Sequence, residues 1–172
     1  MTLGRVYALI GILAVQRLAE LVYARRNTAR LLAAGGTEIG RRHYPLFILL
    51  HSAWFVAIAV LAAPTSSVPW IGLGVLLLLQ MARFWVIRSL GPYWTTRIIT
   101  TPGTPLRRRG PYRWVEHPNY LVVEAEIVLV PLLLDLPVVA IVFGLLNAAL
   151  LTWRIHVEGQ ALAPRRALAA SD

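Results

Sequence analysis

Long apolar stretches recur along the chain and limit what it can fold into. Crossing about 30 Å of hydrocarbon takes about 20 apolar residues in a helix, and an isolated strand cannot satisfy its backbone in lipid. Four stretches approach that length: residues 3–23, 44–62, 69–87 and 137–157. Each of them is therefore predicted to be a transmembrane helix.

A fifth apolar stretch, residues 118–134, contains two acids, Glu124 and Glu126. A carboxylate that faces lipid is costly, and on a helix these two residues point in nearly opposite directions. Both faces of this helix must then touch protein or water. We predict an all-α integral membrane protein of about five transmembrane helices, forming one membrane-embedded domain over residues 1–172.

The composition excludes several classes of protein. Of 172 residues, 58% are hydrophobic and only 15% are charged, which is too apolar for a soluble domain. All 17 basic residues are arginines set between or beside the apolar stretches, so a nucleic-acid partner is not expected. The chain has no cysteine, and its four histidines do not stand at ligand spacing with acids, so no metal site is predicted.

The arginines alternate between the connections. Residues 24–43 and 88–117 are rich in arginine and the C-terminal tail adds more, whereas residues 63–68 and 135–136 have none. Basic residues collect in cytoplasmic loops. We therefore expect the N-terminus outside, the C-terminus in the cytoplasm and the long connection 88–117 in the cytosol. A lysine-free chain fits a GC-rich bacterial genome, so the expected location is the bacterial inner membrane.

Polar side chains within the apolar stretches gather toward the cytoplasmic ends, counting about 1.5 Å per helical residue. They are Arg17, Glu20, His51, Gln80, Arg83, Glu124, Glu126, Arg154 and His156. A proton or ion pathway needs polar groups through the full thickness of the membrane. This distribution instead predicts a pocket open to the cytosol. Taken alone, His51 is more simply explained as a packed core histidine.

The most informative motif is GPYRWVEHPNY, residues 110–120, which leads directly into the fifth apolar stretch. Pro118 is a favourable first residue for a helix, because its missing N–H has no partner there in any case. His117 and Asn119 are then placed at the membrane surface. Tyr112 and Tyr120 add flat faces beside hydrogen-bonding groups, a combination that suits a nucleotide-like ligand.

Together with RIHVEGQAL, residues 154–162, this motif resembles the isoprenylcysteine carboxyl methyltransferase family of membrane enzymes, whose signatures read approximately GPYRxxRHPxY and RIxxEExxL. The order of the two motifs and their separation by one helical hairpin match as well. The N-terminal half is similar to a bacterial branch associated with alkylphenol and alkylpyrone biosynthesis. The resemblance implies methyl transfer from S-adenosylmethionine to a lipophilic acceptor drawn from the bilayer.

The resemblance also implies roles for particular residues. The expected cofactor-binding residues are Tyr112, His117, Pro118, Asn119, Tyr120 and Glu158. Arg154 matches the arginine that lies at the reacting group of the acceptor. Two positions depart from the family pattern: Glu116 stands where a basic residue is usual before His-Pro, and Gly159 replaces the second glutamate.

The acceptor atom stays open at this point. A carboxylate is already ionised at pH 7 and needs only Arg154 to position it, whereas a phenol or enol oxygen, with a pKa near 10 for an ordinary phenol, gains from a base. The candidate bases are Glu126, which leads, then Glu124 and His51. We expect O-methylation of a lipid-tailed phenol or pyrone, then of a carboxylate, with N-methylation of a phospholipid amine as an alternative.

A different class also stays open. The chain could be a non-catalytic membrane subunit that binds lipid or assembles with other proteins, with Arg107, Arg108 and Arg109 attracted to anionic headgroups. The same three arginines are more simply explained by a role in fixing topology. Binding of S-adenosylmethionine separates an enzyme from such a subunit.

Overall fold

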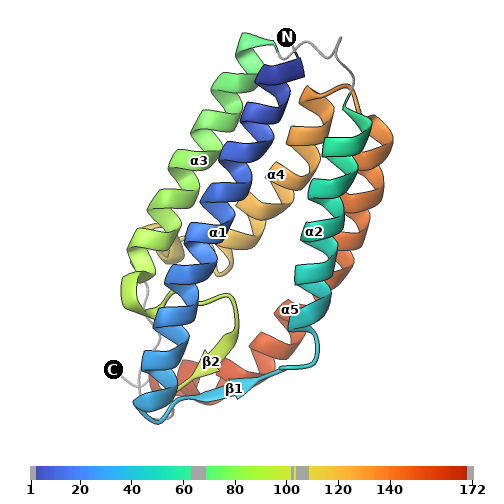
Figure 1. Cartoon of the computed structure of the whole chain (residues 1–172). Helices are drawn as coiled ribbons and strands as arrows, with labels where there is room; N and C mark the ends of the chain where they lie inside the picture. The colour runs from blue at the N-terminus through green and yellow to red at the C-terminus, as the bar shows by residue number, and fades with distance from the viewer. Residues whose placement is uncertain (1–2, 63–68, 102, 104–108, 170–172) are drawn as a thin grey trace.

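The computed structural model describes residues 3–62, 69–101, 103 and 109–169, and this part of the chain holds five α-helices. They are α1 (Leu3–Ala33), α2 (Tyr44–Leu61), α3 (Trp70–Leu90), α4 (Pro118–Leu133) and α5 (Pro137–Ala169). The connections contain two 3₁₀ turns, η1 (Gly91–Tyr93) and η2 (Gly110–Arg113), and two short strands, β1 (Thr37–Ile39) and β2 (Ile98–Thr100). Figure 1 shows the helices side by side in a bundle.

Prolines mark where four of the helices begin. Pro45 lies in the first turn of α2, Pro69 is the N-cap of α3, and Pro118 and Pro137 are the first residues of α4 and α5. Proline suits these positions because its φ is already helical and its missing N–H would have no partner in the first turn. The sharp turn between α4 and α5 is completed by Asp135, whose φ of 59° lies in the left-handed region that aspartate tolerates better than most residues.

Helix α4 lies at the centre of the bundle, packed against α3 and α5 (Figure 1). Its buried residues include Val123, Ile127 and Val130, which join side chains of α1, α2 and α3 in the apolar core. Trp54 of α2 donates its indole N–H to the Ile127 carbonyl at 3.1 Å. Both polar faces of α4 contact protein, as its sequence predicts.

Four of the predicted spans have the length and composition to cross a membrane: α1, α2, α3 and α5. Helix α4 does not reach that length, because its 16 residues extend only about 24 Å at about 1.5 Å per residue. Helices α1 and α5 run on to Ala33 and Ala169, well beyond the predicted ends at residues 23 and 157. Polar residues that form good helices follow both apolar stretches, and polarity alone does not end a helix.

The expectation of an all-α fold missed one feature. Strands β1 and β2 pair antiparallel, with Thr37 opposite Thr100 and Ile39 opposite Ile98. The ladder joins the α1–α2 connection to the α3–α4 connection at the end of the bundle that also holds the C-terminus (Figure 1). Three-residue strands are too short for a periodic signal in the sequence.

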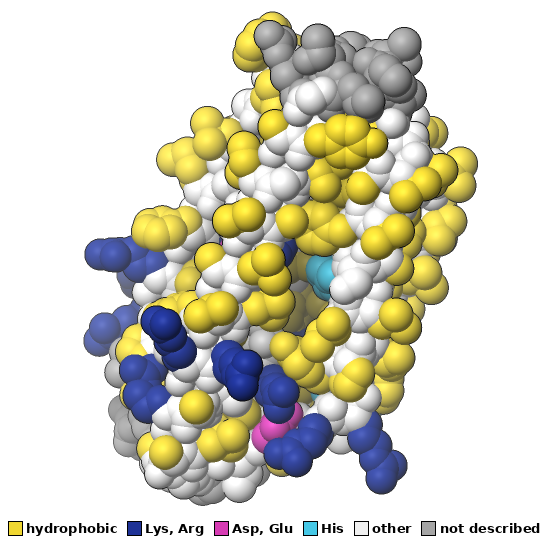
Figure 2. All heavy atoms as spheres, in the orientation of Figure 1, with side chains coloured by type: hydrophobic (Ala, Val, Ile, Leu, Met, Phe, Trp, Pro, Cys, Tyr) yellow, Lys and Arg dark blue, Asp and Glu magenta, His cyan; other side chains and the backbone are white. Residues whose placement is uncertain are grey.

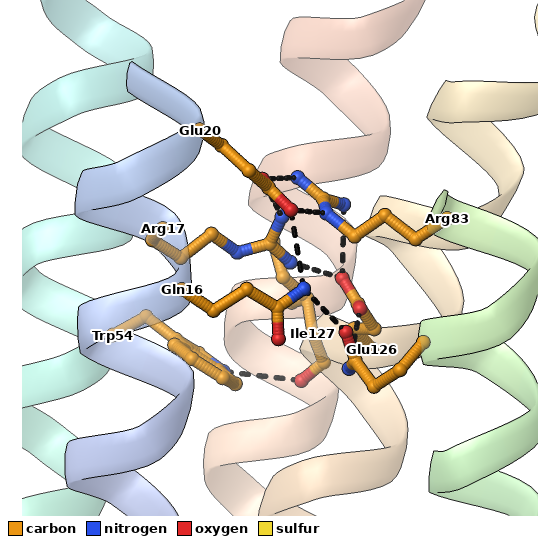
Figure 3. Close-up of polar contacts among 8 residues, drawn as sticks. Gln16, Arg17, Glu20, Trp54, Arg83, Glu126 and Ile127 are labelled. Carbon is orange, nitrogen blue, oxygen red and sulfur yellow. Dashed lines mark hydrogen bonds and ion pairs between the residues drawn. The ribbon is translucent and has the colours of Figure 1, made fainter. Parts of the chain in front are cut away.

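A cluster of charged side chains joins α1, α3 and α4 inside the bundle (Figure 3). Arg83 donates two hydrogen bonds to the Glu20 carboxylate, each 2.6 Å long, and a third to Glu126 at 3.1 Å. Arg17 also donates to Glu126, and Gln80 donates to the other oxygen of that carboxylate at 2.8 Å. Glu126 is only 2% exposed. Two arginines and two glutamates neutralise one another, which is how a helical bundle keeps charge within a membrane.

Glu124, on another side of α4, has a different partner. It accepts a hydrogen bond of 2.7 Å from Asn147 of α5, whose side chain is fully buried. A neutral amide at position 124 could accept the same bond, whereas a neutral amide at position 126 would leave two arginines without their shared carboxylate.

We predict that E126Q lowers stability far more than E124Q, since breaking a buried ion pair from one side costs about 3–5 kcal/mol. The matched substitution E124Q keeps its hydrogen bond and is expected to change the free energy of unfolding by less than about 1 kcal/mol. Thermal unfolding of both variants in detergent, monitored by circular dichroism, makes the comparison. Equal losses would contradict the assignment of the two carboxylates.

Arginines gather at one end of the molecule. Exposed arginines stand on α1 near its C-terminus, on the connection to α2 and at the end of α3, and they include Arg25, Arg26, Arg30, Arg41, Arg42 and Arg88. Figure 2 shows basic side chains reaching from this end to about mid-height of the face in view. The other end carries the α4–α5 turn with Asp135. Arg107 and Arg108 lie outside the described residues, and Arg109 is exposed.

This asymmetry predicts that the arginine-rich end faces the cytoplasm. A fluorescent protein that matures only in the cytoplasm, fused after residue 172, should be bright, and alkaline phosphatase fused there should be inactive. Phosphatase activity at that position would reverse the orientation.

Candidate functional site

The loop before α4 is held against the end of α3. Turn η2 begins at Gly110, whose φ of 56° favours glycine, and a Cβ at this position would collide with the Ser89 hydroxyl. Tyr112 follows within the turn, and His117 is the N-cap of α4. The GPYR motif is therefore a close-approach turn that fixes where Tyr112 and His117 lie relative to α3.

The two sequence motifs meet at the hydroxyl of Tyr120. Arg154 donates from Nε to this hydroxyl at 2.7 Å, and the hydroxyl donates to the Glu158 carboxylate at 2.5 Å. Arg154 is 7% exposed, and its guanidinium also lies over the Tyr120 ring. Among the described residues Arg154 and Glu158 form no direct ion pair, so their link runs through α4 rather than along one face of α5.

His117 completes this arrangement. Its ring stacks on the Tyr120 ring with centroids 5.1 Å apart and planes 10° from parallel. Its Nδ1 lies 3.8 Å from the Glu158 carboxylate. The stack orients both aromatic rings, and Glu158 is placed to pair with a positively charged group of a ligand.

These residues line a cavity of about 610 Å³ at the arginine-rich end of the bundle. Of the sequence-predicted residues, the wall includes Tyr112, His117, Asn119, Tyr120, Arg154 and Glu158. Pro118 is buried beneath the wall and begins the helix. A cavity of about 300–1,000 Å³ is the usual size for a small-molecule site.

Two features of the wall indicate a ligand with both a hydrogen-bond donor and a hydrogen-bond acceptor. The Asn119 side-chain oxygen is buried and lacks a hydrogen-bond partner, a costly state that a donor from a ligand would relieve. Burial and the nearby Glu158 carboxylate raise the pKa of Tyr112, so its phenol keeps its proton and can donate.

The sequence motifs do not reveal the roof of the cavity. Residues of β2 line it, including Ile98 and Ile99, and Leu31 of α1 adds to the wall. The β1 residue Glu38 accepts hydrogen bonds from Arg97 at 3.1 and 3.2 Å and from Arg41 at 3.2 Å. The Arg97 guanidinium lies 4.8 Å from the centre of the Tyr44 ring. The connections thus form a strap over the cavity, and no periodic pattern in the sequence predicts it.

The candidate bases lie apart from the cavity wall. Glu126 is occupied by the arginines of the charged cluster, and Glu124 faces Asn147. His51, on α2, is partly buried, and its Nδ1 lies 2.8 Å from the Phe47 carbonyl. The structure therefore places the leading candidate, Glu126, in an ion-pair cluster that joins three helices.

Within the described ranges, no group of three or more histidines and acids is placed to hold a metal ion.

Comparison with known proteins identifies one family. Residues 70–164 match the family model described as the isoprenylcysteine carboxyl methyltransferase (ICMT) family. The uncharacterized protein YpbQ of Bacillus subtilis (strain 168) is 41% identical over 160 residues, which cover 91% of this chain and 95% of that protein. An uncharacterized protein of Haemophilus influenzae (strain ATCC 51907 / DSM 11121 / KW20 / Rd) is 30% identical over 108 residues, covering 60% of this chain and 63% of that protein.

No solved structure matches the chain. The names of both relatives state no activity, and nothing in these matches supports the alkylphenol and alkylpyrone branch in particular. The family model covers both motifs that meet at Tyr120, and YpbQ is similar over nearly the whole length. The chain belongs to the isoprenylcysteine carboxyl methyltransferase family.

Proposed function

We propose that this protein transfers a methyl group from S-adenosylmethionine to an oxygen atom of a lipophilic acceptor in the membrane. The observation that carries the proposal is the meeting of both family motifs at one hydroxyl, where Tyr120 joins Arg154 to Glu158 on the wall of the cavity. Family membership supports a methyltransferase, and the apolar helices support an acceptor that dissolves in lipid.

The residues of the cavity fit the cofactor. When bound, S-adenosylmethionine supplies an electrophilic methyl group on a positively charged sulfur. Asn119 has an unused acceptor for an amino or hydroxyl group, and Tyr112 and the His117–Tyr120 stack offer aromatic faces and hydrogen bonds. The Glu158 carboxylate attracts the positive charge. Pro118 fixes the start of the helix that carries Asn119 and Tyr120.

The charge of the cavity favours an acidic acceptor over an amine. Four arginines and two glutamates line it: Arg97, Arg113, Arg154, Arg165, Glu116 and Glu158. An amine that is methylated gains or keeps positive charge, and the excess of arginine opposes this. A phenol, enol or carboxylic acid reacts through a negative oxygen, which the arginines stabilise.

Arg154 is the residue best placed to hold that oxygen. It is buried between α4 and α5, it lines the cavity, and its guanidinium lies 5.5 Å from the centre of the Phe47 ring of α2. It therefore stands where the cavity borders the membrane-embedded side of the bundle. The remaining work of the protein is to align the acceptor oxygen with the methyl group and to exclude water, since the sulfonium is already a good leaving group.

The arginine-rich end supports a site that faces the cytosol of a bacterium, with the protein in its inner membrane, because the cofactor is made in that compartment. A non-catalytic lipid-binding or assembly subunit remains the competing class, and it requires no affinity for S-adenosylmethionine.

Tyr120→Phe is expected to weaken cofactor binding, because it removes the hydroxyl that holds Arg154 and Glu158 in place. Hydrogen bonds to charged groups are worth about 1.5–3 kcal/mol, so the loss of affinity is expected to be at most about 150-fold. Calorimetric titration of S-adenosylmethionine into the detergent-solubilised protein measures this. Tyr7→Phe is the matched control, because the Tyr7 hydroxyl bonds the Ala59 carbonyl at the far end of the bundle. Absence of binding to the wild-type protein would reject the enzyme in favour of the subunit.

Arg154 and Glu158 variants should fail in different ways. Arg154→Ala is expected to keep cofactor affinity within about 10-fold and lose acceptor turnover by about 100-fold or more, because its guanidinium faces the acceptor side. Glu158→Gln is expected to lose cofactor affinity. Titration and methyl transfer are measured on both, with exposed Arg109→Ala as the control. A loss of thermal stability alone, shared by both variants, would indicate a structural link between α4 and α5.

A further inference from the structure

A hydroxyl acceptor must lose a proton when it is methylated, and the structure offers few groups that could take it. This inference rests on the proposed function and concerns the acceptor side of the same site. Both oxygens of Glu126 accept hydrogen bonds, from two arginines and from Gln80. Protonating Glu126 would break two buried ion pairs. Glu124 is directed to Asn147 at the contact between α4 and α5.

Unlike Glu126, His51 has a basic atom with no hydrogen-bond partner in the described part of the chain. Its Nδ1 lies 2.8 Å from the Phe47 carbonyl, which can only accept a hydrogen bond. Nδ1 must therefore carry the hydrogen, and the neutral ring presents the lone pair of Nε2. Within the described chain, the structure shows no hydrogen-bond partner for Nε2. This tautomer is the one that a general base requires.

The position of His51 links it to Arg154. The His51 ring lies 6.4 Å from the Phe47 ring, and the Arg154 guanidinium lies 5.5 Å from the same ring. Phe47 is thus an apolar ring with both the His51 ring and the cavity arginine Arg154 close to it. Arg154 also lines the cavity and contacts Tyr120, so Phe47 lies next to the part of the cavity wall that Arg154 forms.

The side of the bundle is open at this level. Figure 2 shows a hollow in this face of the bundle, in which a histidine side chain is visible. His51 of α2 is only partly buried. The charged groups that face His51 are Arg17 of α1 and Glu126 of α4, which belong to the neutral cluster. Arg154 of α5 lies over the neighbouring Phe47 ring.

We propose that His51 is the general base for an acceptor with a phenolic or enolic hydroxyl, and that Arg154 holds the oxygen as it becomes negative. The hydroxyl proton passes to His51 Nε2, and the oxygen forms a bond to the methyl carbon. The carbon–sulfur bond breaks, and its electron pair stays on sulfur to give S-adenosylhomocysteine. His51 then returns the proton to water. A carboxylate acceptor would not use this group.

The test compares two acceptors that differ in acidity, 3-pentadecylphenol and its ring-nitrated derivative, which is ionised near neutral pH without help. His51→Gln should lose about 100-fold or more in kcat/KM with the phenol and less than about 3-fold with the nitrophenol. Its affinity for S-adenosylmethionine should equal that of the wild type. His156→Gln makes the same change at an exposed position of α5 and should alter neither rate.

Equal losses on both acceptors, or no loss on the phenol, would overturn the proposal. So would a wild-type protein that binds S-adenosylmethionine and methylates neither phenol. Failure of the wild type to bind S-adenosylmethionine would instead reject the proposed function. If His51→Gln does not fold, the wild type alone decides: kcat/KM should fall toward acid pH with the phenol and not with the nitrophenol, and identical profiles contradict the base.

A second readout needs no turnover. The nitrophenol probe absorbs differently when it loses its proton, so its ionisation on the cofactor-free protein can be followed in a spectrophotometer. Bound to the wild type and to His156→Gln, the probe should ionise at lower pH than when bound to His51→Gln. Equal titration of the probe on all three proteins would show that His51 does not take its proton.

Discussion

The shared carboxylate of Glu126 is the interaction on which the arrangement of the bundle depends. A charge inside a membrane persists only beside its opposite, and Glu126 has two arginines, one from α1 and one from α3. Arg83 also holds Glu20, so α1 is tied to α3 directly and to α4 through a common partner. The short central helix is thereby fixed in depth and rotation. Tyr120, less than two turns away on the same helix, is then directed toward α5, where Arg154 and Glu158 receive it.

This constraint separates two kinds of polar residue that look alike in the sequence. Arg17, Arg83, Glu20 and Glu126 satisfy one another and leave no site for a ligand. Asn119 and His51 each keep an unshared acceptor, at the cavity and at the hollow respectively. Asn119 Oδ1 is therefore available to a ligand in the cavity, and His51 Nε2 is available to an acceptor. Asn147 Oδ1 is also buried without a partner, but it lies at the contact between α4 and α5.

Much of this could be predicted from the sequence, because length and hydropathy find membrane helices and the two motifs find the cavity wall. The spans of α2 and α3, the buried polar faces of α4 and the convergence of Tyr112, His117, Asn119 and Tyr120 follow from local pattern. The ends of α1 and α5 do not, because helix-forming residues continue past the apolar stretch. Glu126 is the leading candidate base in the sequence. The sequence does not reveal its partners Arg17 and Arg83, because they lie 109 and 43 positions away in the chain. The β1–β2 strap rests on long-range pairing and charge, which leave no periodic trace.

The strap makes the family-matched region of the chain depend on residues that precede it. Residues 70–164 match the family model, but β2 pairs with β1 at residues 37–39, and Arg97 binds Glu38. Trp54 and Arg17, which brace α4, also precede residue 70. The matched region is therefore not an autonomous module. Excised or grafted onto another membrane protein, it would carry the motif residues and β2 but lack β1, which pairs with β2, and the braces on α4. A chimera that preserves activity has to exchange both halves together.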